Sequence, residues 1–167
     1  ECHDLGLKEG VVITVGSIEI EPIFTPGHTN SHYAYFVNSD IHKMVFTGDS
    51  LLINGCGRTD FQSGDPTTLY QSITEKLFTL ADDTLVYPGH DYHGNYVSSI
   101  LQEKTHNPRL GQKLSLNDYL KIMKELKIPK PIMMDYAVPG NERCGKCPDN
   151  VPDALKSPCK IDDMRQG

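Results

Sequence analysis

Short apolar runs alternate with turn-forming residues over the first 50 positions of the chain. Four of these runs are rich in β-branched and aromatic residues and are bounded by Gly, Asn, Ser or Asp: residues 11–15, 18–25, 32–38 and 43–49. Runs of this length between turn formers are typical of consecutive strands in a sheet. The pattern therefore predicts that the first half of the chain consists of β-strands.

A helical spacing of apolar residues replaces this pattern after residue 65. Asp65 can cap a helix that has proline at its first position, and Leu69, Ile73 and Leu77 then recur every four residues on one face. Residues 84–90 return to a strand pattern, so strand, helix and strand alternate as in an α/β layer. We therefore expect this helix to lie on the sheet.

Two further helices are predicted, near residues 96–105 and over residues 116–127. Ser115 can cap the second helix, with Asp118 three positions later, as in a capping box. After residue 129 the chain is rich in Pro, Gly and Cys, so the last ~35 residues are predicted to be ordered loop and tail.

The cysteines give little support for a disulfide framework. There are five of them, an odd number, and three lie near the C-terminus, so a reducing compartment is expected. Cys144 and Cys147 form a C-x-x-C pair, the spacing of many zinc and redox sites. No His or Cys follows Cys159 to complete a zinc site, and the residues around the pair suggest a loop. We therefore interpret these thiols as structural or incidental.

The balance of charges narrows the class of partner. Lys and Arg number 16 against 22 Asp and Glu, which leaves a net charge of −6. This charge disfavours nucleic acid and anionic membrane surfaces, so a small-molecule partner is expected. No run approaches the roughly 20 apolar residues that span a bilayer, and residues 1–10 lack a signal-peptide pattern. We therefore expect a soluble, intracellular protein.

Three residues at the ends of predicted strands share one local pattern. His28, Asp49 and His90 each follow a glycine, which lets the backbone turn sharply and place the next side chain over the strand ends. Two imidazoles and one carboxylate suit a divalent metal, and this set with open positions favours non-haem iron, while zinc is also chemically possible. Taken singly, each corner is more often a surface turn, so the hypothesis depends on all three occurring together.

The segments "TPGHTNSH", "FTGDSLLINGCGRTDF", "YPGHDYHG" and "NPRL" resemble the metallo-β-lactamase superfamily, and within it the persulfide dioxygenases rather than glyoxalase II. The resemblance implies an α/β fold, the metallo-β-lactamase-like αββα sandwich. It also implies iron-dependent oxidation of glutathione persulfide by O2 to sulfite and glutathione, with one Fe(II) in a complete site. Zinc is the alternative metal.

The chain departs from the family pattern before the first matching segment. Members carry an H-x-H-x-D-H motif there, which supplies a metal-binding histidine, and this sequence has none. We therefore expect the C-terminal part of a longer enzyme, with residues 1–135 as part of the metallo-β-lactamase-like domain and 136–167 as a Cys- and Pro-rich loop and tail. Such a part should expose apolar surface and form a homo-oligomer, or be completed by an N-terminal segment.

The resemblance also assigns roles to the three corner residues. It implies that His28 and Asp49 are iron ligands. His90 corresponds to a second-metal ligand in the zinc hydrolases, whereas in the dioxygenases it lies beside a single iron. We therefore predict His28, Asp49 and His90 as catalytic residues, with His90 either a ligand of a second metal or a residue beside the iron.

Four residues are candidates for binding glutathione, whose two carboxylates need local cations. Arg58 offers a guanidinium suited to a carboxylate, and Tyr92 resembles a tyrosine that meets the glutathione backbone in the related hydrolase. Arg143 would approach the pocket from the C-terminal loop. Cys56 would contact the substrate sulfur, although a buried, inert thiol explains it equally well. For each arginine alone, a surface salt bridge is the competing interpretation.

Two other functions compete with the dioxygenase. The first is a zinc-dependent thioester hydrolase of the glyoxalase II type, and the second is a catalytically incomplete chain that acts as an assembly module. The expected location is the bacterial cytoplasm, with the mitochondrial matrix as the alternative, because the family occurs in both.

Overall fold

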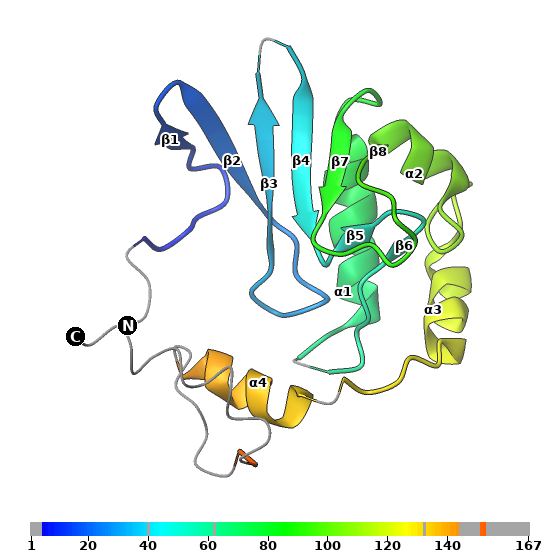
Figure 1. Cartoon of the computed structure of the whole chain (residues 1–167). Helices are drawn as coiled ribbons and strands as arrows, with labels where there is room; N and C mark the ends of the chain where they lie inside the picture. Colours follow the sequence, from blue (N-terminus) through cyan, green and yellow to red (C-terminus); the bar gives the residue numbers. More distant parts are fainter. Residues whose placement is uncertain (1–4, 40, 62, 132, 144–150, 153–167) are drawn as a thin grey trace, which may run out of the picture. The chain divides into compact units, whose positions relative to one another are not determined.

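The computed structural model describes residues 5–39, 41–61, 63–131, 133–143 and 151–152 (Figure 1). The chain divides into two compact units, one of residues 7–126 and one that combines residues 1–6 with 127–167. Each unit is described by itself. Within the described residues, no helix is long and apolar enough to cross a membrane.

The unit of residues 7–126 is built on a mixed six-stranded sheet. Its strands, in spatial order, are β1 (Ile13–Val15), β2 (Ile18–Phe24), β3 (Tyr33–Asn38), β4 (Lys43–Gly48), β7 (Leu85–Pro88) and β8 (Ser98–Ser99). Neighbours pair in antiparallel fashion except β4 and β7, which are parallel. The five predicted strands are confirmed, although β1 begins two residues later than expected.

The helix that follows the first four strands lies behind the sheet in Figure 1. It starts as α1 (Pro66–Gln71) and continues through a π-helical turn, Ser72–Lys76, and a 3-10 turn, Leu77–Thr79. The Asp65 carboxylate caps it by accepting a hydrogen bond from the Thr68 N–H at 2.6 Å. This helix and its cap were predicted from the sequence.

Packing of this helix against the sheet forms the core. Leu69, Ile73 and Leu77 are fully buried in one cluster with Val45 and Val86 of the sheet. Each such side chain contributes about 2 kcal/mol through removal of apolar surface from water. The four-residue apolar spacing is therefore what fixes the helix on this face.

Helix α2 (Ile100–His106) begins later than the predicted residue 96. Tyr96 is exposed, and Ser98 pairs with β7 as part of β8. Ser99 then caps α2, since its Oγ accepts a hydrogen bond from Gln102 N–H at 3.1 Å. The prediction placed helix where the chain still follows the sheet.

Helix α3 (Leu116–Glu125) confirms the other prediction in this region. Its N-cap is Ser115, whose Oγ accepts a hydrogen bond from the Asp118 N–H at 3.3 Å. The Ser115 hydroxyl also donates to the Asp118 carboxylate at 2.6 Å. The helix ends two residues before the expected position.

The second unit contains α4 (Met134–Glu142), where the sequence had predicted loop. That prediction is wrong for this stretch. Pro139 lies inside the helix and lacks the N–H of an ordinary helical residue, which is why the Pro- and Gly-rich composition suggested a loop. The helix starts nonetheless, with the Met133 carbonyl accepting from the Ala137 N–H at 2.8 Å. The predicted domain limits at residue 135 stay a prediction.

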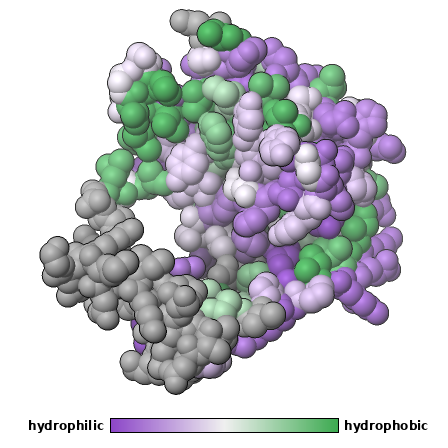
Figure 2. Space-filling view, in the orientation of Figure 1, coloured by the Kyte–Doolittle hydropathy of each residue, from purple (hydrophilic) through white to green (hydrophobic). Residues whose placement is uncertain are grey.

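The sheet face opposite α1 is largely apolar. One row across four strands is formed by Pro22, Tyr35, Phe46 and Tyr87, which are neighbours in the strand register. Phe46 and Tyr87 stack with their ring centroids 5.4 Å apart, and Phe46 is 43% exposed. Figure 2 shows further hydrophobic residues over β1 and β2, where Val15 and Ile18 are exposed.

Candidate functional site

The three predicted corners meet at one edge of the sheet. Because β2 and β4 are both antiparallel to β3, and β4 is parallel to β7, the strands β2, β4 and β7 run in one direction. Their carboxyl ends carry His28, Asp49 and His90 respectively. Two of the corners are joined directly, since Gly89 N–H donates to the Gly48 carbonyl at 2.7 Å.

The corner after β2 is fixed by the start of the long helix. Gly27 has φ +133°, and a Cβ there would lie 2.4 Å from Leu69 Cα, so only glycine fits. The Gly27 carbonyl accepts from Asp65 N–H at 2.8 Å, and Ser72 Oγ donates to the Pro26 carbonyl at 2.7 Å. The helix thereby holds the backbone that presents His28.

His28 is oriented by a backbone carbonyl. Its Nδ1 donates to the Arg58 carbonyl at 2.8 Å, which requires the proton on Nδ1 and leaves Nε2 as the acceptor of the neutral ring. Nε2 faces Asp49 Oδ2 at 3.7 Å, and the ring is 14% exposed. A histidine held through one nitrogen with the other free is the usual arrangement of a metal ligand.

Asp49 contacts both histidines with different oxygens. Oδ2 faces His28, and Oδ1 lies 2.6 Å from His90 Nδ1, a distance for a short, charge-assisted hydrogen bond. His90 is the more open of the two histidines, with 58% of its side chain exposed. The structure thus brings the three predicted residues together, with Asp49 between two imidazoles.

His32 is a contributor that the sequence reasoning missed. Its Nε2 accepts a hydrogen bond from Asp49 N–H at 3.3 Å, and its Nδ1 lies 2.9 Å from Thr25 Oγ1. Burial lowers the pKa of His32, helped by the neighbouring His28, so the ring is held neutral. The signal that would have found it is the register of β3 with β4. Tyr35 pairs with Phe46, so His32, three residues before Tyr35, lies opposite Asp49, three residues after Phe46.

A small hairpin carries the chain from Asp49 to Arg58. It consists of β5 (Leu51–Leu52) and β6 (Gly55–Cys56), and the sequence pattern did not predict it. Gly57 follows directly, and a Cβ there would lie 1.9 Å from the Asp49 carbonyl oxygen and 3.0 Å from His28 Nδ1. The hairpin therefore brings Arg58 back beside the corner that it left.

Buried polar groups from α2 and the following loop anchor this hairpin. The Glu103 carboxylate is fully buried and accepts hydrogen bonds from Asn54 N–H at 3.0 Å and Asn107 Nδ2 at 2.7 Å. Asn107 Nδ2 also reaches the Gly55 carbonyl at 3.0 Å, and Arg109 Nη1 donates to the Cys56 carbonyl at 2.7 Å. Asn107 and Arg109 belong to the "NPRL" segment, to which the sequence had assigned no role.

Arg58 lies beside the site with its charge already paired. Two of its nitrogens donate to the Asp60 carboxylate, each at 2.7 Å, and the guanidinium lies 4.6 Å from the Phe61 ring centroid. The hydrogen bonds with Asp60 raise the pKa of Arg58, and in return they lower the pKa of Asp60. The Asp60 side chain is 64% exposed, so the bidentate pair of Arg58 and Asp60 is open to solvent.

Two other predicted substrate contacts, Tyr92 and Cys56, differ in their exposure to solvent. Tyr92 is 80% exposed, and its ring stacks on His90 with centroids 6.2 Å apart. Cys56 is buried, with Sγ 3.6 Å from the Tyr119 hydroxyl, and burial raises the pKa of its thiol. The packing of Cys56 fits the interpretation of an inert core thiol better than a substrate contact.

Several predicted residues lie outside the site as the structure describes it. Arg143 ends α4 in the second unit, so its contact with substrate stays a prediction. The remaining cysteines lie outside the described residues: Cys2, Cys144, Cys147 and Cys159.

The described residues supply only part of a metal site. Within the part of the chain that the structure describes, no three His, Cys, Asp or Glu side chains are grouped to hold an ion. His28 Nε2 and Asp49 Oδ2 do face each other at 3.7 Å, and two donors that each lie about 2.1 Å from one ion are roughly 3–4 Å apart. The pair fits one side of a metal site, and further ligands are needed to complete it.

Comparison with known protein families identifies the fold. The family model described as the metallo-beta-lactamase superfamily matches residues 3–90. The chain belongs to the metallo-β-lactamase superfamily. This membership confirms the expected fold class, and it implies a metal cofactor.

Within the superfamily, the predicted similarity to persulfide dioxygenases is confirmed. The chain is 51% identical over 142 residues to a protein named persulfide dioxygenase ETHE1, mitochondrial, of Homo sapiens. A crystal structure of ETHE1 from Myxococcus xanthus superposes with a TM-score of 0.80 at 46% identity, covering 86% of this chain and 62% of that one.

Hydroxyacylglutathione hydrolases of the superfamily are also similar to the chain. GloC of Haemophilus influenzae is 41% identical over 106 residues, which cover 64% of this chain and 47% of that protein. The human persulfide dioxygenase matches over 85% of this chain and 54% of its own length. The chain thus spans about half the length of the curated relatives it matches.

Proposed function

We propose that this chain is part of a persulfide dioxygenase that oxidises glutathione persulfide with O2. One persulfide, one O2 and one water give one glutathione, one sulfite and two protons, with four electrons passing from the persulfide to O2. The observation that carries this proposal is the identity of 51% over 142 residues to the human persulfide dioxygenase, against 41% over 106 residues for GloC.

The metal in this proposal is a single Fe(II). His28 Nε2 and Asp49 Oδ2 would hold it from this chain, with the remaining protein ligand coming from a segment outside the described residues. A histidine and carboxylate set with open positions suits non-haem iron, which supplies the redox chemistry with O2.

The contacts of Asp49 support one metal rather than two. Its Oδ1 is engaged by His90 Nδ1 at 2.6 Å, which leaves Oδ2 on the side of His28. His90 then acts by holding the carboxylate in one orientation instead of binding a second ion. The Arg58 carbonyl does the same for the His28 ring through Nδ1. In this proposal His28, Asp49 and His90 are the catalytic residues.

Substrate binding falls to residues on the open side of the corners. A carboxylate of glutathione would take the place of Asp60 on the Arg58 fork, since Asp60 is exposed and offers the same bidentate geometry. Tyr92 would lie along the substrate, because its ring is exposed and stacked on His90. Arg143 is a further proposed contact, whereas the burial of Cys56 favours the alternative of an inert core thiol.

The test is made on the full-length protein that carries this chain, loaded anaerobically with Fe(II). We expect one iron per site, and one O2 consumed for each glutathione persulfide, with sulfite as a product. Asp49→Asn should abolish bound iron and O2 uptake, whereas His42→Gln, on the exposed turn after β3, should change neither. Two bound zinc ions with cleavage of a glutathione thioester would instead support the hydroxyacylglutathione hydrolase function.

The assembly and location of the protein are part of the same proposal. The chain would be completed by an N-terminal segment or act as a homo-oligomer. If the protein neither binds iron nor consumes O2, the alternative of a catalytically inert assembly module is supported instead. The mammalian relatives are named as mitochondrial proteins, which fits the mitochondrial matrix, while the bacterial cytoplasm stays a prediction.

A further inference from the structure

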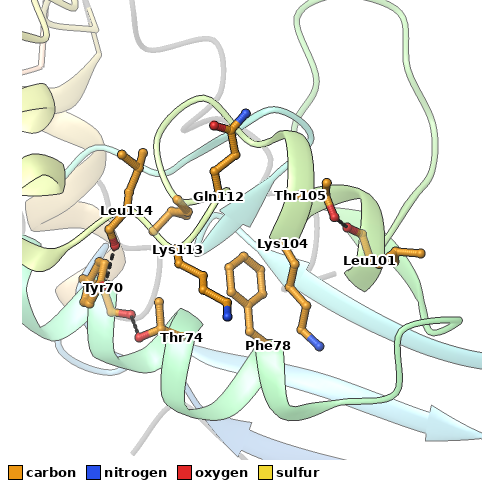
Figure 3. A pocket seen from close by; sticks show the side chains of 10 residues that line it. Tyr70, Thr74, Phe78, Leu101, Lys104, Thr105, Gln112, Lys113 and Leu114 are labelled. Carbon is orange, nitrogen blue, oxygen red and sulfur yellow. Dashed lines mark hydrogen bonds between the residues drawn. The ribbon is translucent and has the colours of Figure 1, made fainter.

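A cavity of about 580 Å³ lies among the helices and shares no lining residue with the strand-end site (Figure 3). Its walls are the helix that starts with α1, helix α2 and the loop of residues 110–114. Cavities of this size commonly bind small organic molecules. The lining is mostly apolar, with Phe78 at its centre and Leu101 and Leu114 at opposite ends in Figure 3.

Two ammonium groups flank the Phe78 ring in this cavity (Figure 3), and its lining contains no Asp or Glu. Lys104 is already paired, with its Nζ 2.6 Å from Asp82 Oδ1. Lys113 makes no hydrogen bond or ion pair with another residue of the described chain. The cavity is open to solvent, since Leu101 and Lys113 are exposed. It therefore combines an apolar wall with one positive charge that has no partner among the described residues.

The backbone of the loop holds Lys113 in an uncommon conformation. Gln112 and Lys113 have φ of +54° and +56°, in the left-handed region that residues other than glycine rarely adopt. Gln112 N–H donates to the Lys104 carbonyl at 2.9 Å, and the Tyr70 hydroxyl donates to the Leu114 carbonyl at 2.7 Å. Left-handed backbone conformations that neighbouring hydrogen bonds enforce in this way are found most often at functional and ligand sites.

The opposite wall is also irregular. Thr74 lines the cavity from the π-helical turn of residues 72–76, and such turns occur frequently at functional sites. The Thr74 hydroxyl donates to the Tyr70 carbonyl at 2.8 Å, so its oxygen faces a ligand only as an acceptor. Lys113 is therefore the ammonium that a ligand can reach without sharing or displacing the partner of another residue.

We propose that this cavity binds an amphipathic carboxylate. Its apolar chain, of about eight to ten carbons, lies against Phe78 and Leu101, and its carboxylate pairs with Lys113 Nζ. The proposal adds a second ligand site to the chain and does not depend on the reaction at the strand ends.

The experiment uses octanoate as the probe and titrates it calorimetrically into the full-length protein that carries this chain, with octanol and octylammonium in parallel. We expect octanoate to bind at least tenfold more tightly than octanol, and octylammonium not to bind, because the unpaired charge is positive. Equal affinity for octanoate and octanol, or no binding of octanoate, would overturn the proposal.

Variants locate the probe. Lys113→Met should lower octanoate affinity about tenfold and leave octanol unchanged, whereas Lys121→Met, on the exposed side of α3, should change neither. Thr105→Trp should fill the cavity and weaken both ligands. The proposal is refuted if octanoate still binds Lys113→Met with unchanged affinity but no longer binds Arg58→Gln. That result would place the carboxylate at the strand-end site. Circular dichroism of each variant establishes that the fold is retained.

Discussion

Replacing Gly57 by alanine tests how closely the hairpin is packed against the strand-end site. The added Cβ would lie 1.9 Å from the Asp49 carbonyl oxygen, where ordinary contact begins at 3.4 Å. The backbone would have to retreat by about 1.5 Å, because the atom it meets is itself backbone and cannot rotate away. Both neighbours of the clash, Asp49 and His28, are the proposed ligands.

The size of the effect follows from this displacement. Overpacking of a closely fitted interior costs about 1–3 kcal/mol, and a clash between two backbone segments belongs at the upper end, about 3 kcal/mol. For a chain of this length, 1 kcal/mol shifts the midpoint of thermal unfolding by about 2–4 °C, so a decrease of about 6–12 °C is expected. A shift of about 1 Å at a catalytic group costs on the order of a hundredfold in rate.

The control is Gly55→Ala, two positions earlier in the same hairpin. The atoms nearest to a Cβ at Gly55 would belong to the Arg109 side chain, at 3.6 Å, which is ordinary contact. Gly57→Ala should therefore unfold well below wild type by differential scanning calorimetry, while Gly55→Ala stays within about 2 °C of it. Equal midpoints for the two variants would refute the packing argument.

Three further predictions concern stability and reactivity. Asp65→Ala should lower the free energy of unfolding by about 1 kcal/mol in urea titrations, because α1 loses its cap. The hydrogen bond from Thr68 lowers the pKa of Asp65, so this stabilisation is complete above the unfolded pKa of about 4 and is lost as the pH falls below it. The difference in free energy of unfolding between wild type and Asp65→Asn should therefore shrink in acid, and a difference that does not change with pH would contradict this. Asn107→Ala should cost about 2 kcal/mol, since the buried Glu103 carboxylate and Gly55 carbonyl each lose a donor, and an unchanged unfolding midpoint would exclude that role. Cys56 should resist iodoacetamide in the native chain and react after unfolding, as followed by peptide mapping, because burial raises the pKa of its thiol; rapid native labelling would show that the thiol is accessible.

The parts of the fold that follow a strong local pattern could be predicted from the sequence. The spacing of Leu69, Ile73 and Leu77 placed a helix on the sheet because burial of that face outweighs local variation within the helix. Helix α4 was missed because Pro139 argues against a helix interior, and nothing in the local sequence shows what compensates for it. The hairpin of β5 and β6 was missed because strands of two residues leave no alternation to detect.

The site was predictable where side-chain chemistry and backbone shape coincide. His28, Asp49 and His90 were found because each follows a glycine at a strand end. His32 was missed because its contact with Asp49 depends on the pairing of β3 with β4. The carbonyl of Arg58 was missed for a different reason, since a backbone acceptor carries no signature in the residue type.

The parallel pairing of β4 with β7 has a consequence for folding kinetics. Strands β1 to β4 pair with their neighbours in sequence, so they need only short loops to close, whereas β4 and β7 are joined by a crossover of roughly 35 residues. We therefore expect amides of β2 and β3 to gain protection in pulsed hydrogen exchange before those of β7, and simultaneous protection would exclude this order. Asp49 and His90 lie on opposite sides of that crossover in the sequence. A nascent chain would therefore fold the antiparallel strands β1 to β4 first and bring these two residues of the strand-end site together last.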